Sequence, residues 1–359
     1  MARLQLRAIS VLGIGVWARR SRVLEHPRRS LPAGRALSVG AVLTGLALLG
    51  ASVPASAQAL TWSVVPSPSP GALSGVSCTS AAACTAVGDY GNSSDNPTTL
   101  VESWNGTSWT VVPSPSPGSS ANGLSGVSCV SAAACTAVGS RADSTDLLPK
   151  TLIESWNGAS WSVVPSPNRG SDGDPLSGVS CVSLAACTAV GTKSIGVNFV
   201  PRTLIESWNG TSWSVVPSPN PGSGDDLGGV SCVSAAACTA VGYYFIGDAG
   251  RKTLIESWNG ISWSVVPSPN LVLSDYLDGV SCASAAACTA VGLYFAKNGD
   301  RRTLIESWNG ISWSVVPSPN LLHNDHLYGV SCASAAGCTA VGYYYDPSRT
   351  LIESGTASG

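Results

Sequence analysis

Along most of the chain, short runs of alternating apolar and polar residues recur, and no run has the longer period of a helix. In one repeat, residues 178–181 and 187–191 are short runs of small and β-branched residues, and residues 203–208 form a third, alternating run. Asn209-Gly210 is a hairpin signal, and the fourth run after it ends at Pro217 because proline cannot donate to a strand ladder. Each repeat therefore predicts four antiparallel strands, which we name a, b, c and d in chain order.

Cysteine pairs mark the period of the repeat. Each pair has the spacing C-x5-C, and the first cysteines of successive pairs are 51, 52, 51, 50 and 50 residues apart. A four-stranded unit of this length is typical of a β-propeller blade, whereas solenoid units are usually shorter or helical. The sequence therefore predicts an all-β fold, a six-bladed β-propeller of four-stranded antiparallel blades.

The two ends of the repeat array are out of phase. The last repeat stops after its third strand, at residues 350–354, and the array begins with an isolated fourth strand, Trp62-Ser63-Val64-Val65. We expect this N-terminal strand to complete the last blade, because the exchange closes the ring and removes exposed strand edges.

Residues 1–57 have the composition of an export leader. Eight arginines precede an apolar stretch at residues 36–53, and Ala55-Ser56-Ala57 fits a signal-peptidase site. We therefore expect a signal leader at 1–57, a propeller at 58–359 and a protein that is secreted or held at the cell surface. An uncleaved leader that anchors the chain in a membrane is the alternative, since no other long apolar run is present.

Charge argues against one class of partner once the leader is set aside. Eleven of the 19 Lys and Arg residues and 20 of the 21 Asp and Glu residues follow residue 57, so this part has a net charge of −9. Because nucleic-acid binding needs a basic surface, nucleic acid is excluded as a partner.

All twelve cysteines belong to the C-x5-C pairs, which in an exported chain predicts disulfides between strands a and b. Zinc sites are the alternative, but they need cysteines from two blades to converge. The predicted bridges are Cys78–Cys84, Cys129–Cys135, Cys181–Cys187, Cys232–Cys238, Cys282–Cys288 and Cys332–Cys338.

Tryptophan and glutamate also recur at fixed places. Two tryptophans, such as Trp208 and Trp213, flank the Asn-Gly turn, and we expect them to pack between blades rather than to stack on sugars. A glutamate inside strand c, such as Glu206, is expected to be a structural acid that accepts hydrogen bonds, with a catalytic or metal role as the alternative.

Chemical variety is confined to one end of the predicted blades. The a–b and c–d hairpins lie at one end, here the hairpin rim, and the b–c and d–a links lie at the other, here the variable rim. Lys, Arg, Asp, Tyr and Phe fall in the links or at their strand junctions. Repeat proteins often bind through one such face, although aromatic residues that extend strand b could instead pack between blades. The predicted binding residues are Tyr243, Tyr244, Phe245, Asp275, Tyr276, Tyr294, Phe295, Tyr328, Tyr343 and Tyr344.

Catalytic and metal patterns are nearly absent. His323 and His326 are the two histidines after the leader, and a pair within one loop is a weak metal site. The sequence has no serine nucleophile elbow and no phosphate-binding glycine loop. We therefore predict no catalytic residues, no metal ligands and no cofactor.

The units S-W-N-G-x-S-W-S-V-V-P-S-P-N and G-V-S-C-x5-C-x-A-V-G resemble the repeats of secreted bacterial β-propeller proteins, which are loosely similar to the kelch and galactose-oxidase-type propellers. The resemblance covers residues 62–354 and implies the fold, but little about activity. The chain differs from those propellers in lacking the double-glycine strand of kelch units and the copper ligands of such an oxidase.

These features favour an exported, monomeric and non-enzymatic module that binds a glycan or a protein at the cell surface through the variable rim. One alternative is a carbohydrate-active enzyme with its site at the mouth of the central channel, and another is a structural or adhesive repeat protein. An enzyme should show unlike buried polar groups there, and a binder an exposed aromatic patch. The channel-mouth candidates are Ser74, Ser125, Ser177, Gly228, Asp278 and Tyr328.

Overall fold

The computed structural model describes residues 65–91, 96–145, 147–168, 173–196, 198–247, 250–272, 274–320, 324–335, 337–344 and 349–356. The predicted leader, residues 62–64 of the predicted N-terminal strand and His323 lie outside these ranges. Within them, no helix is long and apolar enough to cross a membrane.

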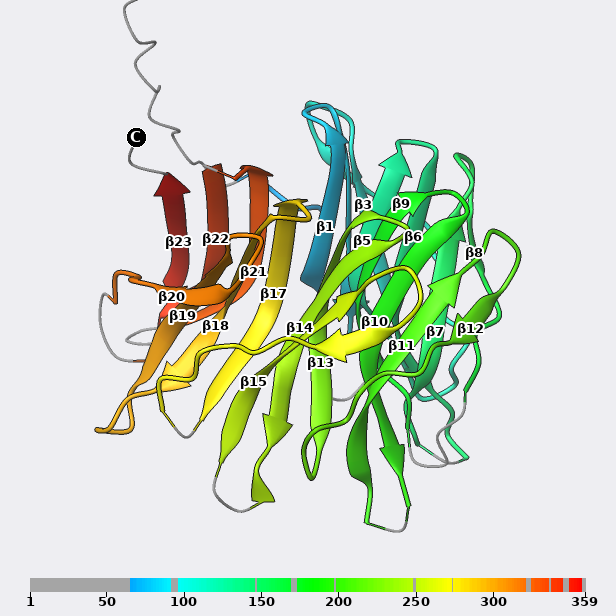
Figure 1. The fold of residues 1–359 in the computed structure, drawn as a ribbon. Helices are drawn as coiled ribbons and strands as arrows, with labels where there is room; N and C mark the ends of the chain where they lie inside the picture. The colour runs from blue at the N-terminus through cyan, green and yellow to red at the C-terminus, as the bar shows by residue number, and fades with distance from the viewer. Residues whose placement is uncertain are drawn as a thin grey trace, which may run out of the picture. The chain divides into compact units, whose positions relative to one another are not determined.

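Six antiparallel sheets follow one another along the chain and form the six blades of a β-propeller, which confirms the predicted fold (Figure 1). In every blade the strands lie in chain order. Strands a are β1 (Ala72–Ser80), β5 (Ala121–Ser131), β9 (Leu176–Ser183), β13 (Asp225–Ser234), β17 (Asp275–Ser284) and β21 (His326–Ser334). Strands b are β2 (Ala83–Tyr90), β6 (Ala134–Ala142), β10 (Ala186–Ile195), β14 (Ala237–Phe245), β18 (Ala287–Phe295) and β22 (Gly337–Tyr344).

The outer two strands of each blade are c and d. Strands c are β3 (Thr98–Trp104), β7 (Lys150–Trp156), β11 (Val200–Trp208), β15 (Arg251–Trp258), β19 (Arg301–Trp308) and β23 (Arg349–Thr356). Strands d are β4 (Trp109–Val111), β8 (Trp161–Val163), β12 (Trp213–Val215), β16 (Trp263–Val265) and β20 (Trp313–Val316). Among the described residues the sixth blade has three strands, because its predicted strand d falls largely on residues that the structure does not describe.

Local sequence explains the c–d hairpins. In the third blade the Asn209 side-chain Oδ1 accepts hydrogen bonds from the N–H groups of Thr211 and Ser212, both at 2.9 Å. Gly210 follows with φ of 92°, a left-handed conformation that glycine adopts without steric cost. The turn therefore depends on the Asn-Gly pair that the sequence repeats in each of the first five blades.

Strands a are the inner strands, and neighbouring strands a approach each other closely through glycine. A Cβ at Gly178 would lie 3.2 Å from the carbonyl oxygen of Gly228 and 3.3 Å from the Cα of Gly229 in the next blade. Glycine at the start of the GVSC run in each of the first five blades thus lets that blade approach the next one closely.

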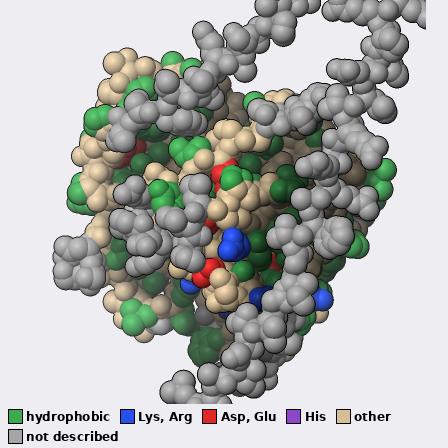
Figure 2. Space-filling model, turned by 90° about the vertical axis from the view of Figure 1, so that its left-hand side faces the viewer, with side chains coloured by type: hydrophobic (Ala, Val, Ile, Leu, Met, Phe, Trp, Pro, Cys, Tyr) green, Lys and Arg blue, Asp and Glu red, His purple; other side chains and the backbone are tan. Residues whose placement is uncertain are grey.

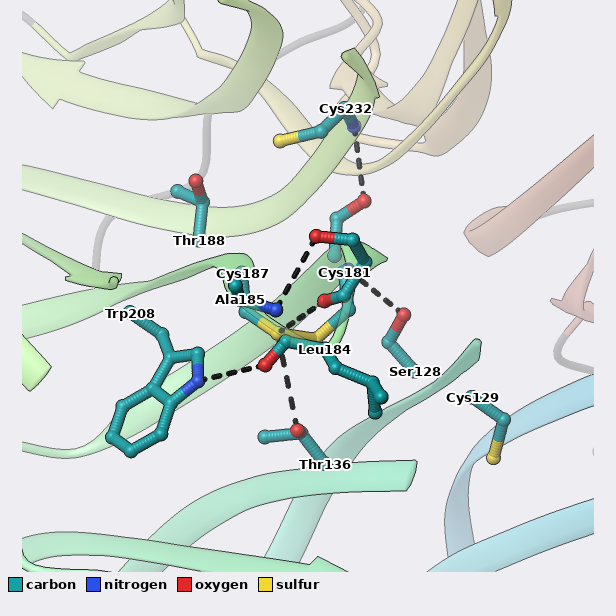
Figure 3. Close-up of a disulfide and its surroundings, with 12 residues drawn as sticks. Ser128, Cys129, Thr136, Cys181, Leu184, Ala185, Cys187, Thr188, Trp208 and Cys232 are labelled. Carbon is teal, nitrogen blue, oxygen red and sulfur yellow. Dashed lines mark hydrogen bonds between the residues drawn. A yellow bond between two sulfur atoms is a disulfide. The ribbon is translucent and has the colours of Figure 1, made fainter. Parts of the chain in front are cut away.

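The six predicted disulfides are present, and each joins residues that pair directly across strands a and b. Figure 3 shows how Cys181–Cys187 is connected to its surroundings. The Cys181 N–H donates to Ser128 Oγ of the preceding blade at 2.9 Å, and the Trp208 indole N–H donates to the Leu184 carbonyl at 3.0 Å (Figure 3). The a–b hairpin, its disulfide and the hydrogen bond to the preceding blade therefore stabilise the same part of the blade.

The hydrophobic core lies between blades rather than inside a single sheet. Val138 and Ile153 of the second blade pack against Leu176, Ala189 and Trp213 of the third, and all five are buried. The same arrangement recurs between the other consecutive blades. The predicted packing role of the tryptophans is thus confirmed.

Removing one bridge tests the contribution of the disulfides. Replacing Cys181 and Cys187 with alanine should lower the free energy of unfolding by about 2 kcal/mol, because the unfolded chain regains the freedom of the short loop. Denaturant titration measures this change. The comparison variant is C78A/C84A, which should lower the free energy of unfolding by less, because Cys84 is only half-buried. An unchanged unfolding midpoint in the Cys181–Cys187 variant would contradict a stabilising role.

Candidate binding site on the variable rim

Strand β14 of the fourth blade ends at the variable rim with Tyr243, Tyr244 and Phe245. Successive side chains of a strand point to opposite faces, so Tyr243 and Phe245 share one face and Tyr244 points to the other. Tyr244 packs against the core between the third and fourth blades. Tyr243 and Phe245 instead contact each other on the rim, with ring centroids 5.7 Å apart.

The remaining predicted aromatic residues divide in the same way. Tyr294 and Tyr344 pack against the cores between blades, as the alternative interpretation allowed. Tyr276 lies 5.0 Å from Tyr243 and 6.0 Å from Phe295, measured between ring centroids. Aromatic rings of the fourth and fifth blades therefore form a continuous series.

The series continues into the sixth blade through Arg301. Its guanidinium carbon lies 5.6 Å from the centre of the Phe295 ring, and its Nη1 donates to the Tyr343 hydroxyl at 3.5 Å. The rings of Tyr343 and Tyr328 are 5.6 Å apart. We name the six residues of this series the aromatic row: Tyr243, Phe245, Tyr276, Phe295, Tyr328 and Tyr343.

Arg251 holds the first half of the aromatic row together. Its guanidinium carbon lies 4.5–5.2 Å from the ring centres of Phe245, Tyr276 and Tyr243, which are cation–π distances. The Arg251 Nε is buried and has no hydrogen-bond partner among the described residues. The three rings therefore provide much of the environment of this cation.

Ionisable groups lie beside the aromatic row. His326 is buried, its Nε2 is 2.8 Å from Asp278 Oδ2, and its ring centre is 3.9 Å from that of Tyr328. Asp226 accepts a hydrogen bond from the Thr192 hydroxyl. Burial raises the pKa of Asp226 above its ordinary value, and the negative charge of Asp278 raises this pKa further.

Two tyrosine hydroxyls of the row, those of Tyr243 and Tyr328, have a pKa above that of free tyrosine. Burial, followed by the charge of Asp226, raises the pKa of Tyr243. Burial and the neighbouring Tyr343 hydroxyl raise the pKa of Tyr328 to about 12. Near neutral pH these hydroxyls are therefore protonated and can donate hydrogen bonds to a ligand.

The sequence anticipated the six aromatic residues of the row and Asp278, but not the two arginines. Asp278 and Tyr328 are channel-mouth candidates that the structure brings together with the aromatic row. Arg251 and Arg301 were missed as members of the site, although each pairs in the ladder with the phenylalanine that ends strand b. The other channel-mouth candidates, in the first four blades, are serine or glycine: Ser74, Ser125, Ser177 and Gly228.

Asp275 differs from the other predicted binding residues. Its side chain is fully buried and accepts hydrogen bonds from the N–H groups of Leu271 and Val272 at 2.6 and 3.3 Å. Asp225 accepts from Gly222 N–H at 2.7 Å in the same way. These aspartates hold the d–a links in place, so we do not assign Asp275 to the ligand-binding surface.

The recurrent glutamates have the structural role that the sequence predicts. Each accepts a hydrogen bond from a serine of the preceding d–a link, at 2.5–2.7 Å. Glu206, which accepts from Ser166, is fully buried, and burial raises its pKa to about 7. In the described part of the chain, no three His, Cys, Asp or Glu side chains are grouped to hold a metal ion.

Comparisons with known proteins give the fold alone. No family model and no curated protein matches the chain. Among solved structures, the GH74 xyloglucanase from Xanthomonas campestris aligns with a TM-score of 0.53 and 12% identity, over 80% of this chain and 44% of that one. YjhT aligns with a TM-score of 0.50 and 12% identity, over 81% of this chain and 100% of that one. A PL25 ulvan lyase bound to -[GlcA(1-4)Rha3S]- aligns with a TM-score of 0.50 and 10% identity, over 77% and 76% of the two chains.

The buried glutamates make stability depend on pH. The pKa of Glu206 is about 7 in the folded state against an ordinary value of 4.5, so the folded protein binds more protons between these values. Stability should be greatest below pH 4.5, fall as the pH rises to 7 and then level off. Glu154, Glu256 and Glu306, whose pKa values are also raised to about 7 by burial, add to the fall.

Glu206→Gln isolates one of these contributions, because glutamine keeps the shape and the acceptor for Ser166 but cannot ionise. Melting temperatures measured from pH 4.5 to 8 should fall less steeply in the variant, which should be the more stable protein above pH 7. A variant that is destabilised equally at every pH would contradict the protonated buried state.

Proposed function

We propose that this protein is an exported, non-enzymatic binding module that holds a glycan at the cell surface through the aromatic row of the variable rim. The observation that carries the proposal is the series of six aromatic side chains that crosses three consecutive blades with two arginines between them. Sugar rings present C–H faces that stack on aromatic rings, and their hydroxyls pair with arginine and carboxylate groups.

The shape of the row supports an extended ligand. Its rings belong to residues of strands a and b in three blades. A bound glycan chain would therefore run across blade boundaries rather than into one blade. Rigid strands position the rings, which lowers the entropy lost when a ligand binds. A protein partner would use the same aromatic and charged groups and is the alternative occupant.

The export part of the proposal rests on the arginine-rich leader and on six disulfides, which favour an oxidising compartment. The resemblance of the repeats to those of secreted bacterial β-propeller proteins is in keeping with this location. A monomer suffices, because one chain supplies the complete aromatic row.

Binding should depend on rings of the row and not on aromatic residues elsewhere on the same rim. Tyr328→Ala and Tyr276→Ala should each weaken binding about fivefold or more, since losing a stacked ring costs on the order of 1 kcal/mol. Tyr90→Ala is the matched control, because Tyr90 is 50% exposed at the variable rim of the first blade and Tyr328 is 51% exposed.

The measurement is a screen of glycans, cell-wall fragments and surface proteins, followed by titration of the tightest ligand. Equal losses in Tyr90→Ala and Tyr328→Ala would contradict the assignment of the site. If the screen finds binding to a protein and to no glycan, the ligand of the aromatic row is a protein.

One observation favours an enzyme as a second candidate. The close His326–Asp278 pair lies against Tyr328, and such a pair of unlike groups could transfer protons to or from a sugar. The test is product release from a polysaccharide panel by the unaltered protein and by His326→Gln. Under the binding proposal neither protein releases product, whereas turnover that His326→Gln abolishes would establish the enzyme.

A further inference from the structure

Arg251 and Arg301 occupy the same position in the fourth and fifth blades, two residues before the threonine that opens the TLIES run. The first three blades carry proline at this position: Pro97, Pro149 and Pro201. Each arginine pairs in the ladder with the phenylalanine that ends strand b. Two neighbouring blades therefore place a cation beside the aromatic row where other blades have a rigid, uncharged residue.

These two arginines lack the acidic partner that holds another cation of the same rim. In the third blade, Arg202 at the start of strand c donates to Asp225 at 2.8 Å. Within the described part of the chain, neither Arg251 nor Arg301 forms an ion pair with a carboxylate. The charge of each therefore remains available to a ligand of opposite sign.

The surroundings of Arg251 favour an anion over water as its partner. Its side chain is half-buried among three rings, and its Nε is fully buried with no acceptor among the described residues. A charged donor that is removed from water without an acceptor is unfavourable, and an oxyanion at the exposed part of the guanidinium would balance this charge. Figure 2 shows Lys and Arg side chains in the lower half of one face, with hydrophobic side chains among them.

A cationic ligand does not fit this surface. Aromatic faces attract cations, but Arg251 already lies over Tyr276 and Phe245, and Arg301 lies 5.6 Å from the centre of the Phe295 ring. A positively charged group would compete with these guanidinium groups and be repelled by them.

Acidic groups near the row oppose an anion only weakly. Asp278 is paired with His326 at 2.8 Å, and Asp226 accepts from Thr192 with a pKa that burial raises above its ordinary value. The chain after residue 57 has a net charge of −9, but charges more than about 8 Å away are largely screened at physiological ionic strength. The nearby arginines therefore dominate the local interaction.

We propose that the ligand of the aromatic row is an acidic glycan whose carboxylate or sulfate groups bind Arg251 and Arg301. This inference rests on the proposed function, because it names the ligand class of the same site. The rings of Tyr276 and Phe295 lie between the two guanidinium groups and would stack on the sugars that connect the acidic units. Arginine suits this role because its planar fork binds such oxyanions through two parallel hydrogen bonds.

The test compares acidic polymers with their neutral forms, using the full chain. Polygalacturonate is titrated against its methyl ester, which keeps the sugars and removes the charge, and a sulfated galactan is titrated against the desulfated polymer. The unaltered protein should bind at least one acidic polymer about tenfold or more tightly than its neutral form, since a hydrogen bond to a charged group contributes more than a neutral one. Which acidic polymer binds identifies carboxylate or sulfate as the recognised group.

Variants show whether the two arginines recognise the charge. Arg301→Gln should lose about tenfold or more in affinity for the acidic polymer and little for the neutral one, and this side chain is exposed, so the fold should tolerate the change. Arg251→Gln should behave alike, with its melting temperature measured in parallel. Lys252→Gln is the matched control, because it removes the same charge from the same strand but lies opposite Tyr244, away from the row.

The outcomes separate this inference from the proposed function. Equal affinity for the acidic and neutral polymers, equal losses in Lys252→Gln and Arg301→Gln, or no binding to any acidic polymer would each overturn the acidic ligand class. If Tyr276→Ala still weakens binding to a neutral glycan in those cases, the glycan-binding function stands. If Tyr276→Ala weakens binding to no polymer, the proposed function itself is wrong.

Discussion

Apolar burial between neighbouring blades is the interaction on which the rest of the structure depends. A single four-stranded sheet of this sequence is apolar on both faces and cannot bury either face by itself. Trp213, Leu176 and Ala189 become buried only because the second blade covers them. Each disulfide joins strands a and b within one blade, and the hydrogen bond from a cysteine N–H to a serine of the preceding blade then fixes how one blade sits on the next.

This dependence explains why so much of the fold could be predicted from sequence. A core built between identical units must repeat the residues of both faces, so the period, the strands and the disulfides are all visible in the chain. The structural roles of Glu206 and Trp208 follow from the same repetition. A residue that recurs in every unit contributes to the packing that every unit makes with its neighbour.

The binding surface was only partly predictable, for the opposite reason. Its residues differ between blades, and which of them meet depends on strand direction and on distances across blade boundaries. The alternation of side chains separates Tyr243 from Tyr244, yet both read as rim tyrosines in the sequence. Asp275 has the composition of a ligand-binding acid, but its hydrogen bonds to Leu271 and Val272 occupy it within the link. Arg301 joins two blades, a contact that no local pattern reveals.

The d–a links are pinned at both ends by hydrogen bonds to the sheets. Ser218 contacts Glu256, the Asn220 side chain accepts from the Thr203 N–H at 2.9 Å, and Asp225 closes the far end on Gly222. Gly222, Ser223 and Gly224, which lie between Asn220 and Asp225, make most of their contacts through backbone N–H and C=O groups, which any residue type except proline carries. Evolution can therefore lengthen, shorten or rewrite that segment while the scaffold keeps its stability, much as antibody loops diversify on a constant framework. The fold is, in this respect, a ready platform for grafting new recognition loops.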